Sequence, residues 1–150
     1  MFSVEKRIVI DASPAAVFSF LDDPRNHVKI TPSLVDIENI EALPDGGKRA
    51  AYRYTLAGIE LVGKVEDVER SPDERLVQRL SGAIDGTIRY ELEAEETDEG
   101  DAESRTSLRY EAEYELPATV VDSLLAPIAK AYNQREAKAT LENLKTFLEA

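Results

Sequence analysis

Hydrophobic and polar residues alternate along two long segments in the second half of the chain. Across residues 84–95 the even-numbered positions are apolar, aromatic or small, while the odd-numbered positions are mostly charged. Residues 104–116 repeat the pattern, with Leu108, Tyr110 and Tyr114 on the apolar side. Because successive side chains of a strand point to opposite faces, this period of two predicts long antiparallel strands with one buried face and one wet, acidic face.

Further strands are predicted wherever the alternation recurs between turn signals. They cover residues 2–11, 33–43, 49–57, 59–70 and 76–81. Pro-Asp-Gly-Gly at 44–47 and Ser-Pro-Asp-Glu at 71–74 are typical turn sequences. The sequence therefore predicts an antiparallel sheet of six to seven strands.

Helices are predicted at both ends of this sheet. Ser13 stands where a helix N-cap belongs, and apolar residues at helical spacing follow it, so a helix is expected at 14–21. A second short helix or turn is expected at 23–30, and the last strand leads into helices at 118–126 and 127–148. Only the last helix is long enough to cover the apolar face of the sheet, which indicates an α+β fold.

The long helix changes character along its length. Leu141, Leu144 and Leu148 form an apolar stripe that should pack tightly on the sheet. The upstream positions carry smaller or amphipathic side chains: Ile128, Ala131, Tyr132, Arg135 and Ala139. Either these side chains leave room over the middle of the sheet, or they let the helix approach it closely, and the sequence leaves both readings open.

The expected buried face is rich in tyrosine. A buried tyrosine hydroxyl needs a hydrogen-bond partner. One such ring could reach the backbone or water, but the group as a whole indicates a partly wet cavity that binds an apolar molecule. The predicted lining residues are Tyr52, Tyr54, Leu61, Ile88, Tyr90, Tyr110, Tyr114, Ile128 and Tyr132.

Three polar residues are candidates for the pocket or its mouth. His27, the only histidine, could act as a general base if it were buried beside Asp22 or Asp23. The favoured interpretation is that His27 is exposed and inactive. Arg53 could bind a ligand carboxylate only if the strand faced the other way, and otherwise it pairs with a glutamate on the surface. Arg135 is the third candidate.

The composition disfavours several classes of function. The 150 residues carry 18 basic and 30 acidic side chains, a net charge of -12, with no basic cluster, so nucleic acid is not an expected partner. One histidine and no cysteine cannot form the usual zinc sites, and neither a metal nor a cofactor is expected. No segment resembles a membrane span or a secretory signal, so we predict a cytoplasmic protein without stable membrane insertion.

The acidic excess has two interpretations. It could simply keep the protein soluble, or it could reflect a cytoplasm at high salt, where repulsion between surface charges is screened. Two acidic rows, at 84–95 and 104–116, are expected on adjacent strands, where like charges opposite each other destabilise a sheet. The sequence therefore predicts that thermal stability rises as KCl is raised to molar concentrations.

Several segments together resemble a known superfamily. They are VEKRIVIDASPAAVFSFLDDP at 4–24, Gly58 between two strands, the Ser71-Pro72 turn and LENLK at 141–145. They resemble the START-like superfamily, also called SRPBCC or birch-pollen-allergen-like, and its polyketide cyclase/dehydrase and lipid transport branch. The resemblance implies one START-like domain over residues 1–150 with a helix-grip fold. In that fold a curved antiparallel sheet surrounds a long C-terminal helix, two short helices follow strand one, and an apolar pocket lies between sheet and helix.

The resemblance narrows the function without fixing it, because the matching segments are structural and the family shares no catalytic set. The favoured expectation is the binding or transport of a hydrophobic small molecule such as a lipid, isoprenoid or quinone. One alternative is a cyclase/dehydratase-type enzyme that moves protons with pocket tyrosines, His27 or Arg53. A second alternative is a protein-interaction module of the same fold. Ligand, reaction and oligomeric state stay open.

Overall fold

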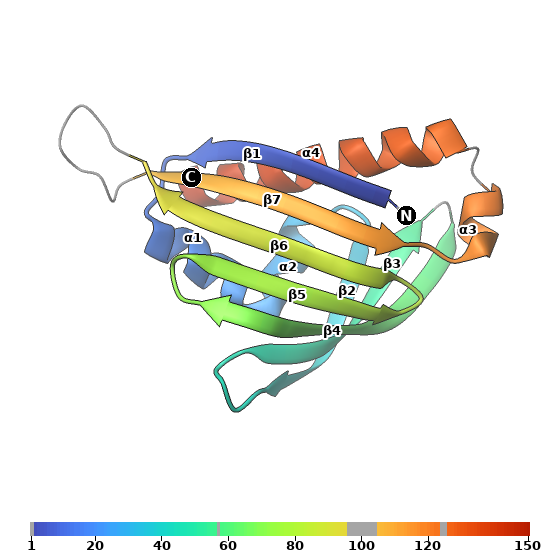
Figure 1. The fold of residues 1–150 in the computed structure, drawn as a ribbon, viewed down its shortest axis with the longest axis horizontal. Helices are drawn as coiled ribbons and strands as arrows, with labels where there is room; N and C mark the ends of the chain where they lie inside the picture. The colour runs from blue at the N-terminus through green and yellow to red at the C-terminus, as the bar shows by residue number, and fades with distance from the viewer. Residues whose placement is uncertain (1, 57, 96–104, 124–125) are drawn as a thin grey trace.

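The fold is built on a curved antiparallel sheet of seven strands, and a long C-terminal helix lies along one face of the sheet (Figure 1). The structure is a computed structural model that describes all residues except 1, 57, 96–104 and 124–125. The strands are β1 (Phe2–Ile10), β2 (Leu34–Ala42), β3 (Lys48–Leu56), β4 (Ile59–Ser71), β5 (Arg75–Gly82), β6 (Asp85–Ala94) and β7 (Thr106–Glu115). The helices are α1 (Pro14–Asp22), α2 (Pro24–Ile30), α3 (Ala118–Ser123) and α4 (Ala126–Glu149). The predicted α+β, helix-grip architecture is confirmed.

The strand order is β1-β7-β6-β5-β4-β3-β2, so the first strand lies beside the last. Phe2 is opposite Tyr114, and Ile10 is opposite Thr106. The chain must therefore cross from one edge of the sheet to the other between β1 and β2, and α1 and α2 make that crossing (Figure 1). As a result, α1 lies near β5 and β6, and α2 lies against β2 and α4.

The starts of the two short helices follow from their first residues. The Ser13 hydroxyl accepts a hydrogen bond from the Ala16 N–H at 3.1 Å, and Pro14 is the first residue of α1. Asp23 repeats this arrangement for α2, where its carboxylate accepts the Arg25 N–H at 3.1 Å. These caps satisfy backbone donors that have no partner within the helix. The segment predicted as a second short helix or turn is a helix.

The acidic outer face differs from the expectation. The register places Arg89 opposite Glu111 and Glu91 opposite Arg109, so most facing charges on β6 and β7 are of opposite sign. The Arg109 guanidinium also lies 2.8 Å from a carboxylate oxygen of Glu5 on β1. The two acidic rows do lie on adjacent strands, but Asp85 and Glu115 are the one pair of like charges that face each other between β6 and β7. Alternation gives the face of each strand but not its register with the neighbour.

Candidate functional site

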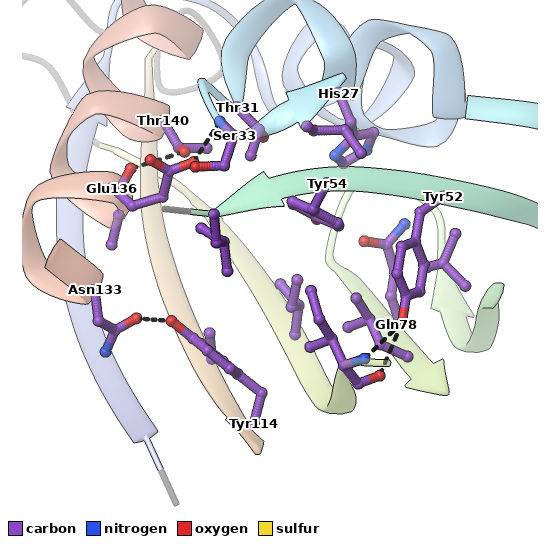
Figure 2. Close-up of a pocket in the computed structure, with 18 of the residues that line it drawn as sticks. His27, Thr31, Ser33, Tyr52, Tyr54, Gln78, Tyr114, Asn133, Glu136 and Thr140 are labelled. Carbon is purple, nitrogen blue, oxygen red and sulfur yellow. Dashed lines mark hydrogen bonds between the residues drawn. The ribbon is translucent and has the colours of Figure 1, made fainter. Parts of the chain in front are cut away.

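A cavity of about 260 Å³ lies between the sheet and α4 (Figure 2). Its wall is built by residues from β2 to β7, from α2 and the loop after it, and from α4. Most of the wall is hydrocarbon, contributed among others by Leu34, Leu56, Leu80, Ile84, Ile88 and Leu116. The cavity is therefore an apolar space with a limited number of polar groups, which is the usual make-up of a small-molecule site.

Most of the predicted lining residues lie in this wall. They are Tyr52, Tyr54, Ile88, Tyr90, Tyr110, Tyr114 and Tyr132. Leu61 is buried in an apolar cluster with Leu34, Leu56 and Leu80 instead, and it is not among the described lining residues. Ile128 lies on the solvent side of α4, with 52% of its surface exposed. The placement of these two residues was wrong, and the ligand-binding roles of the others remain predictions.

Tyr52 has a structural role in the cavity wall. Its hydroxyl lies 2.7 Å from the carbonyl oxygen of Ser81 and accepts the Ile84 N–H at 2.9 Å. Gly63 leaves room for it, since a Cβ there would lie 2.3 Å from the hydroxyl oxygen. Tyr52 thus ties β3 to the turn between β5 and β6.

Three other tyrosines are different. The hydroxyls of Tyr54, Tyr90 and Tyr110 form no hydrogen bond with any described residue, although all three side chains line the cavity. The rings of Tyr90 and Tyr110 are opposite each other on β6 and β7, with centroids 5.5 Å apart. Burial raises the pKa of each phenol well above its ordinary value. These groups therefore stay neutral near pH 7 and can donate a hydrogen bond to whatever occupies the cavity.

A polar strip lies on the helix side of the cavity (Figure 2). A carboxylate oxygen of Glu136 accepts the Ser33 N–H at 2.8 Å, and the Ser33 hydroxyl lies 2.5 Å from that of Tyr132. Further along α4, the Tyr114 hydroxyl donates to the side-chain oxygen of Asn133. The strip connects α4 to the loop after α2 and to β7.

The sequence pattern did not identify the polar residues of the cavity wall. They are Thr31, Ser33, Gln78, Asn133, Glu136 and Thr140. A signal for the helical members was present: counting back from Leu144 and Leu141 in steps of three and four leads to Thr140, Ala137 and Asn133. No comparable signal exists for Ser33, which lies in a loop and reaches the site only through its contacts with α4.

His27 lies in the cavity wall and is 7% exposed, so the prediction of an exposed residue was wrong. Its Nε2 lies 2.7 Å from the carbonyl oxygen of Leu21. Because a carbonyl can only accept, Nε2 carries the proton and Nδ1 keeps a free lone pair. Burial lowers the pKa of His27, so the ring is neutral near pH 7. It lies edge-on to Tyr90, with ring centroids 6.0 Å apart.

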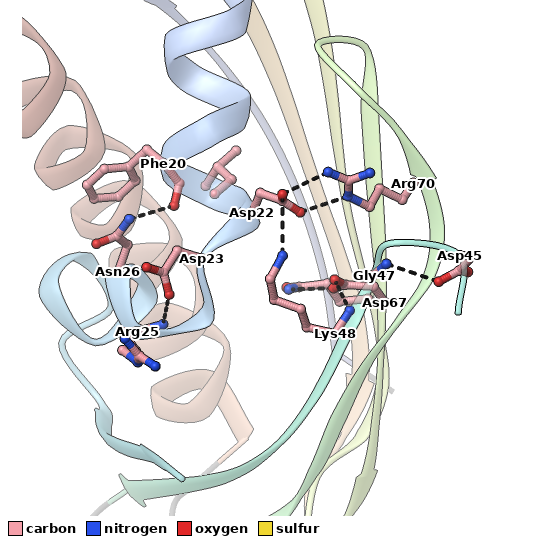
Figure 3. Close-up of polar contacts among 12 residues, drawn as sticks. Phe20, Asp22, Asp23, Arg25, Asn26, Asp45, Gly47, Lys48, Asp67 and Arg70 are labelled. Carbon is pink, nitrogen blue, oxygen red and sulfur yellow. Dashed lines mark hydrogen bonds and ion pairs between the residues drawn. The ribbon is translucent and has the colours of Figure 1, made fainter. Parts of the chain in front are cut away.

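The two aspartates considered as partners of His27 have other roles (Figure 3). The Asp22 carboxylate takes two hydrogen bonds from Arg70, at 2.9 and 2.8 Å, and these hold its pKa below the ordinary value. Lys48 lies 3.4 Å from the same carboxylate, and Asp23 caps α2. The histidine–carboxylate pair that the sequence left as an alternative is therefore not formed with Asp22 or Asp23.

A buried carboxylate backs this wall (Figure 3). Asp67 is 6% exposed, and it accepts the Lys48 N–H at 2.9 Å and the amide of Gln78 at 3.3 Å. Burial raises the pKa of Asp67. Because Gln78 lines the cavity, this contact orients one polar group of the wall.

Neither candidate arginine reaches the cavity. Arg53 lies on the outer face with its guanidinium 3.4 Å from the Asp36 carboxylate, so the surface interpretation is correct, with an aspartate in place of the expected glutamate. Arg135 is exposed and its guanidinium lies 5.9 Å from the ring centre of Tyr132. Among the described lining residues there is no lysine or arginine, and Glu136 is the one carboxylate.

The described part of the chain lacks the features of two further classes of site. It holds no cluster of three or more His, Cys, Asp or Glu side chains suited to a metal ion. None of its helices has the length and apolar character needed to cross a membrane. The groups that face the cavity are neutral hydroxyls and amides, one imidazole and one carboxylate.

Comparison with known proteins places this chain in a family. The family described as polyketide cyclase / dehydrase and lipid transport matches residues 1–149. The chain belongs to this family. No curated protein sequence matches the chain.

Solved structures share the fold at low sequence identity. A START superfamily protein from Mycobacterium smegmatis is 14% identical and superimposes with a TM-score of 0.75, covering 99% of this chain and 98% of that one. The Zhui aromatase/cyclase from Streptomyces is 16% identical with a TM-score of 0.76, covering 98% and 93%. The Aha1 dimer from Colwellia psychrerythraea is 18% identical with a TM-score of 0.64, covering 99% and 97%. These likenesses establish the START-like fold.

Proposed function

We propose that this protein binds a hydrophobic small molecule that carries at least one polar oxygen atom, in the cavity between the sheet and α4. One observation carries the proposal: Tyr54, Tyr90 and Tyr110 line an apolar cavity with hydroxyls that have no partner among the described residues. A buried polar group without a partner costs about 1–3 kcal/mol. A carbonyl or hydroxyl oxygen of a ligand would satisfy these donors.

The size of the cavity supports the same conclusion. At about 24 cal/mol per Å³, a dry and empty cavity of 260 Å³ would cost about 6 kcal/mol. That is comparable to the whole stability of a small domain, about 5 to 15 kcal/mol. The cavity is therefore filled in solution by water or by a ligand. Displacing water from such an apolar wall makes the binding of a mostly apolar molecule favourable.

Ligand-induced stabilisation tests the proposal. The probes are 1-decanol, 1,4-naphthoquinone and 1-naphthalenemethanol, and the variant Ile88→Trp fills the cavity from β6. Val62→Trp is the matched control, because Val62 is 55% exposed on the outer face. A ligand at 100 times its Kd should raise stability by about 2.7 kcal/mol in the wild type and in Val62→Trp, and not in Ile88→Trp. If no probe binds, or if Ile88→Trp binds equally well, the proposal is wrong.

A second candidate function is a cyclase- or dehydratase-type enzyme, and His27 favours it. Its Nδ1 is a free base in the cavity wall, beside the phenol of Tyr90. A ketone held by the tyrosine hydroxyls could lose a proton from its α-carbon to this nitrogen, while the hydroxyls stabilise the enolate oxygen.

His27→Gln tests this second candidate, because a glutamine amide can still donate to the Leu21 carbonyl. Turnover of a poly-β-ketone thioester would fall by about 100-fold or more, with little change in binding, if His27 is the base. Equal turnover in the variant would exclude that role and leave the binding function in place.

A further inference from the structure

We infer that the cavity selects its ligand by charge: Glu136 makes it accept neutral or cationic groups and reject carboxylates. The inference rests on the proposed function and adds the class of ligand to it. It would separate alcohols, ketones and amines, which fit, from fatty acids and other organic acids, which do not.

The described part of the cavity wall carries a negative charge and no positive charge. The described lining residues include one carboxylate, that of Glu136, and no lysine or arginine. The two candidate arginines, Arg53 and Arg135, lie on the surface with contacts of their own. His27 is a neutral donor to Leu21 and supplies no positive charge. A ligand carboxylate would therefore find no counter-ion in the wall.

Glu136 is held at the cavity by its contacts. It extends from α4 toward the loop after α2 (Figure 2), where it accepts the Ser33 N–H at 2.8 Å. The hydroxyls of Ser33 and Tyr132 meet beside it. These contacts fix the carboxylate in the wall, and they leave lone pairs that an alcohol or ammonium group of a ligand can use.

The hydroxyls of Tyr54, Tyr90 and Tyr110 could donate hydrogen bonds to an anion. The charge of Glu136 acts on Tyr54 and Tyr110, where it contributes to raising the pKa of both phenols. A carboxylate placed at those hydroxyls would experience the same negative field. Hydrogen bonds from neutral phenols do not cancel that repulsion, so the site favours a neutral oxygen acceptor there.

The expected effect is large enough to measure. Two like charges about 8 Å apart, at an effective dielectric constant of about 20, repel enough to weaken binding about 10- to 100-fold.

The experiment uses three ligands of one shape: 1-naphthalenemethanol, 1-naphthylmethylammonium and 1-naphthoate. Kd is measured by calorimetry at pH 7.5 for the wild type and for Glu136→Gln, which keeps an acceptor for the Ser33 N–H and removes the charge. Glu142→Gln is the matched control, since Glu142 is exposed on the same helix and pairs with Lys138 at 4.0 Å. We expect the wild type and Glu142→Gln to bind the naphthoate at least about 10-fold more weakly than the alcohol, and Glu136→Gln to lose most of that difference.

Each outcome decides a separate point. If the wild type binds the naphthoate as tightly as the alcohol, the inference is overturned while the proposed function stands. If the difference is equally large in Glu136→Gln, the assignment to Glu136 is overturned. If none of the three ligands binds, nor any probe of the first panel, the proposed function fails as well. The wild-type ranking is informative by itself, so an unstable Glu136→Gln variant would not rescue the inference.

Discussion

The two ends of the interface between sheet and α4 differ. At the C-terminal end, Leu141 and Leu144 are buried with Phe18 and Leu21 of α1 in one apolar cluster. At the other end, Tyr132, Asn133 and Glu136 face the sheet across the cavity. α1 packs at the first end, whereas α2 contributes Pro24 and His27 to the cavity wall. One helix thus closes the core where its side chains are large and apolar, and borders a ligand-sized space where they are polar.

This comparison shows how a small fold can keep a cavity. At the closed end, Leu21, Leu141 and Leu144 are removed from water and stabilise the fold without bordering the cavity. The cavity wall can then hold neutral hydroxyls that have no partner among the described residues.

The largest expected effect comes from the closed end. Leu144 has no exposed surface, so Leu144→Ala should lower the free energy of unfolding by about 3 kcal/mol or more, and the Tm by about 10 °C. Leu34→Ala is the matched change at the open end, where the side chain already borders the cavity. We expect it to cost clearly less in urea unfolding, and equal losses would remove the distinction between the two ends.

The next effect separates two kinds of tyrosine in the cavity wall. Tyr52→Phe leaves the Ile84 N–H without its acceptor, so it should cost about 1–3 kcal/mol. Tyr90→Phe removes a hydroxyl that has no partner among the described residues, and stability should change by less than about 0.5 kcal/mol. Thermal and urea unfolding of both variants measure this difference. A large loss in Tyr90→Phe would mean that its hydroxyl has a structural role.

The pH dependence of stability should report on His27 in the cavity wall. Burial lowers the pKa of His27 in the folded state below its ordinary value of 6.5. As pH falls below about 6.5, the unfolded chain takes up the proton first, so the free energy of unfolding should fall, by at most about 1.4 kcal/mol per pH unit. Below the folded pKa the loss levels off. Urea unfolding between pH 7.5 and 5 measures the slope.

His27→Gln is the control for this titration. Asp67 has a raised pKa and acts in the opposite sense, because the folded protein takes up its proton first as pH falls. The difference between wild type and His27→Gln isolates the histidine. If both show the same slope, His27 does not titrate as proposed.

The smallest effect concerns the outer face, which is common to both ends. The net charge of -12 still predicts that Tm rises when KCl is raised to molar concentrations. Because arginines on β6 and β7 are opposite glutamates, the rise should be smaller than two facing acidic rows would give. A Tm that stays level or falls across the series would contradict the prediction.

Much of the fold could be predicted because local patterns determine it. Ser13 and Pro14 mark the start of α1, and alternation assigns the faces of β6 and β7. The same parity placed Tyr90 and Tyr110 on the buried side. Pattern reasoning failed on α4 at Ile128, because small and polar residues there give no clear apolar stripe from which to read its face.

By itself the sequence determined the order of the elements, the buried faces of β6 and β7 and the tight end of α4. It did so because these depend on propensity and period within one segment. Only the tertiary structure decided that His27 is buried with Nε2 on the Leu21 carbonyl, that Glu136 borders the cavity, and that Arg89 is opposite Glu111. Each of these depends on how segments far apart in the chain meet, and no periodicity within one segment contains the register or crossing of its neighbour.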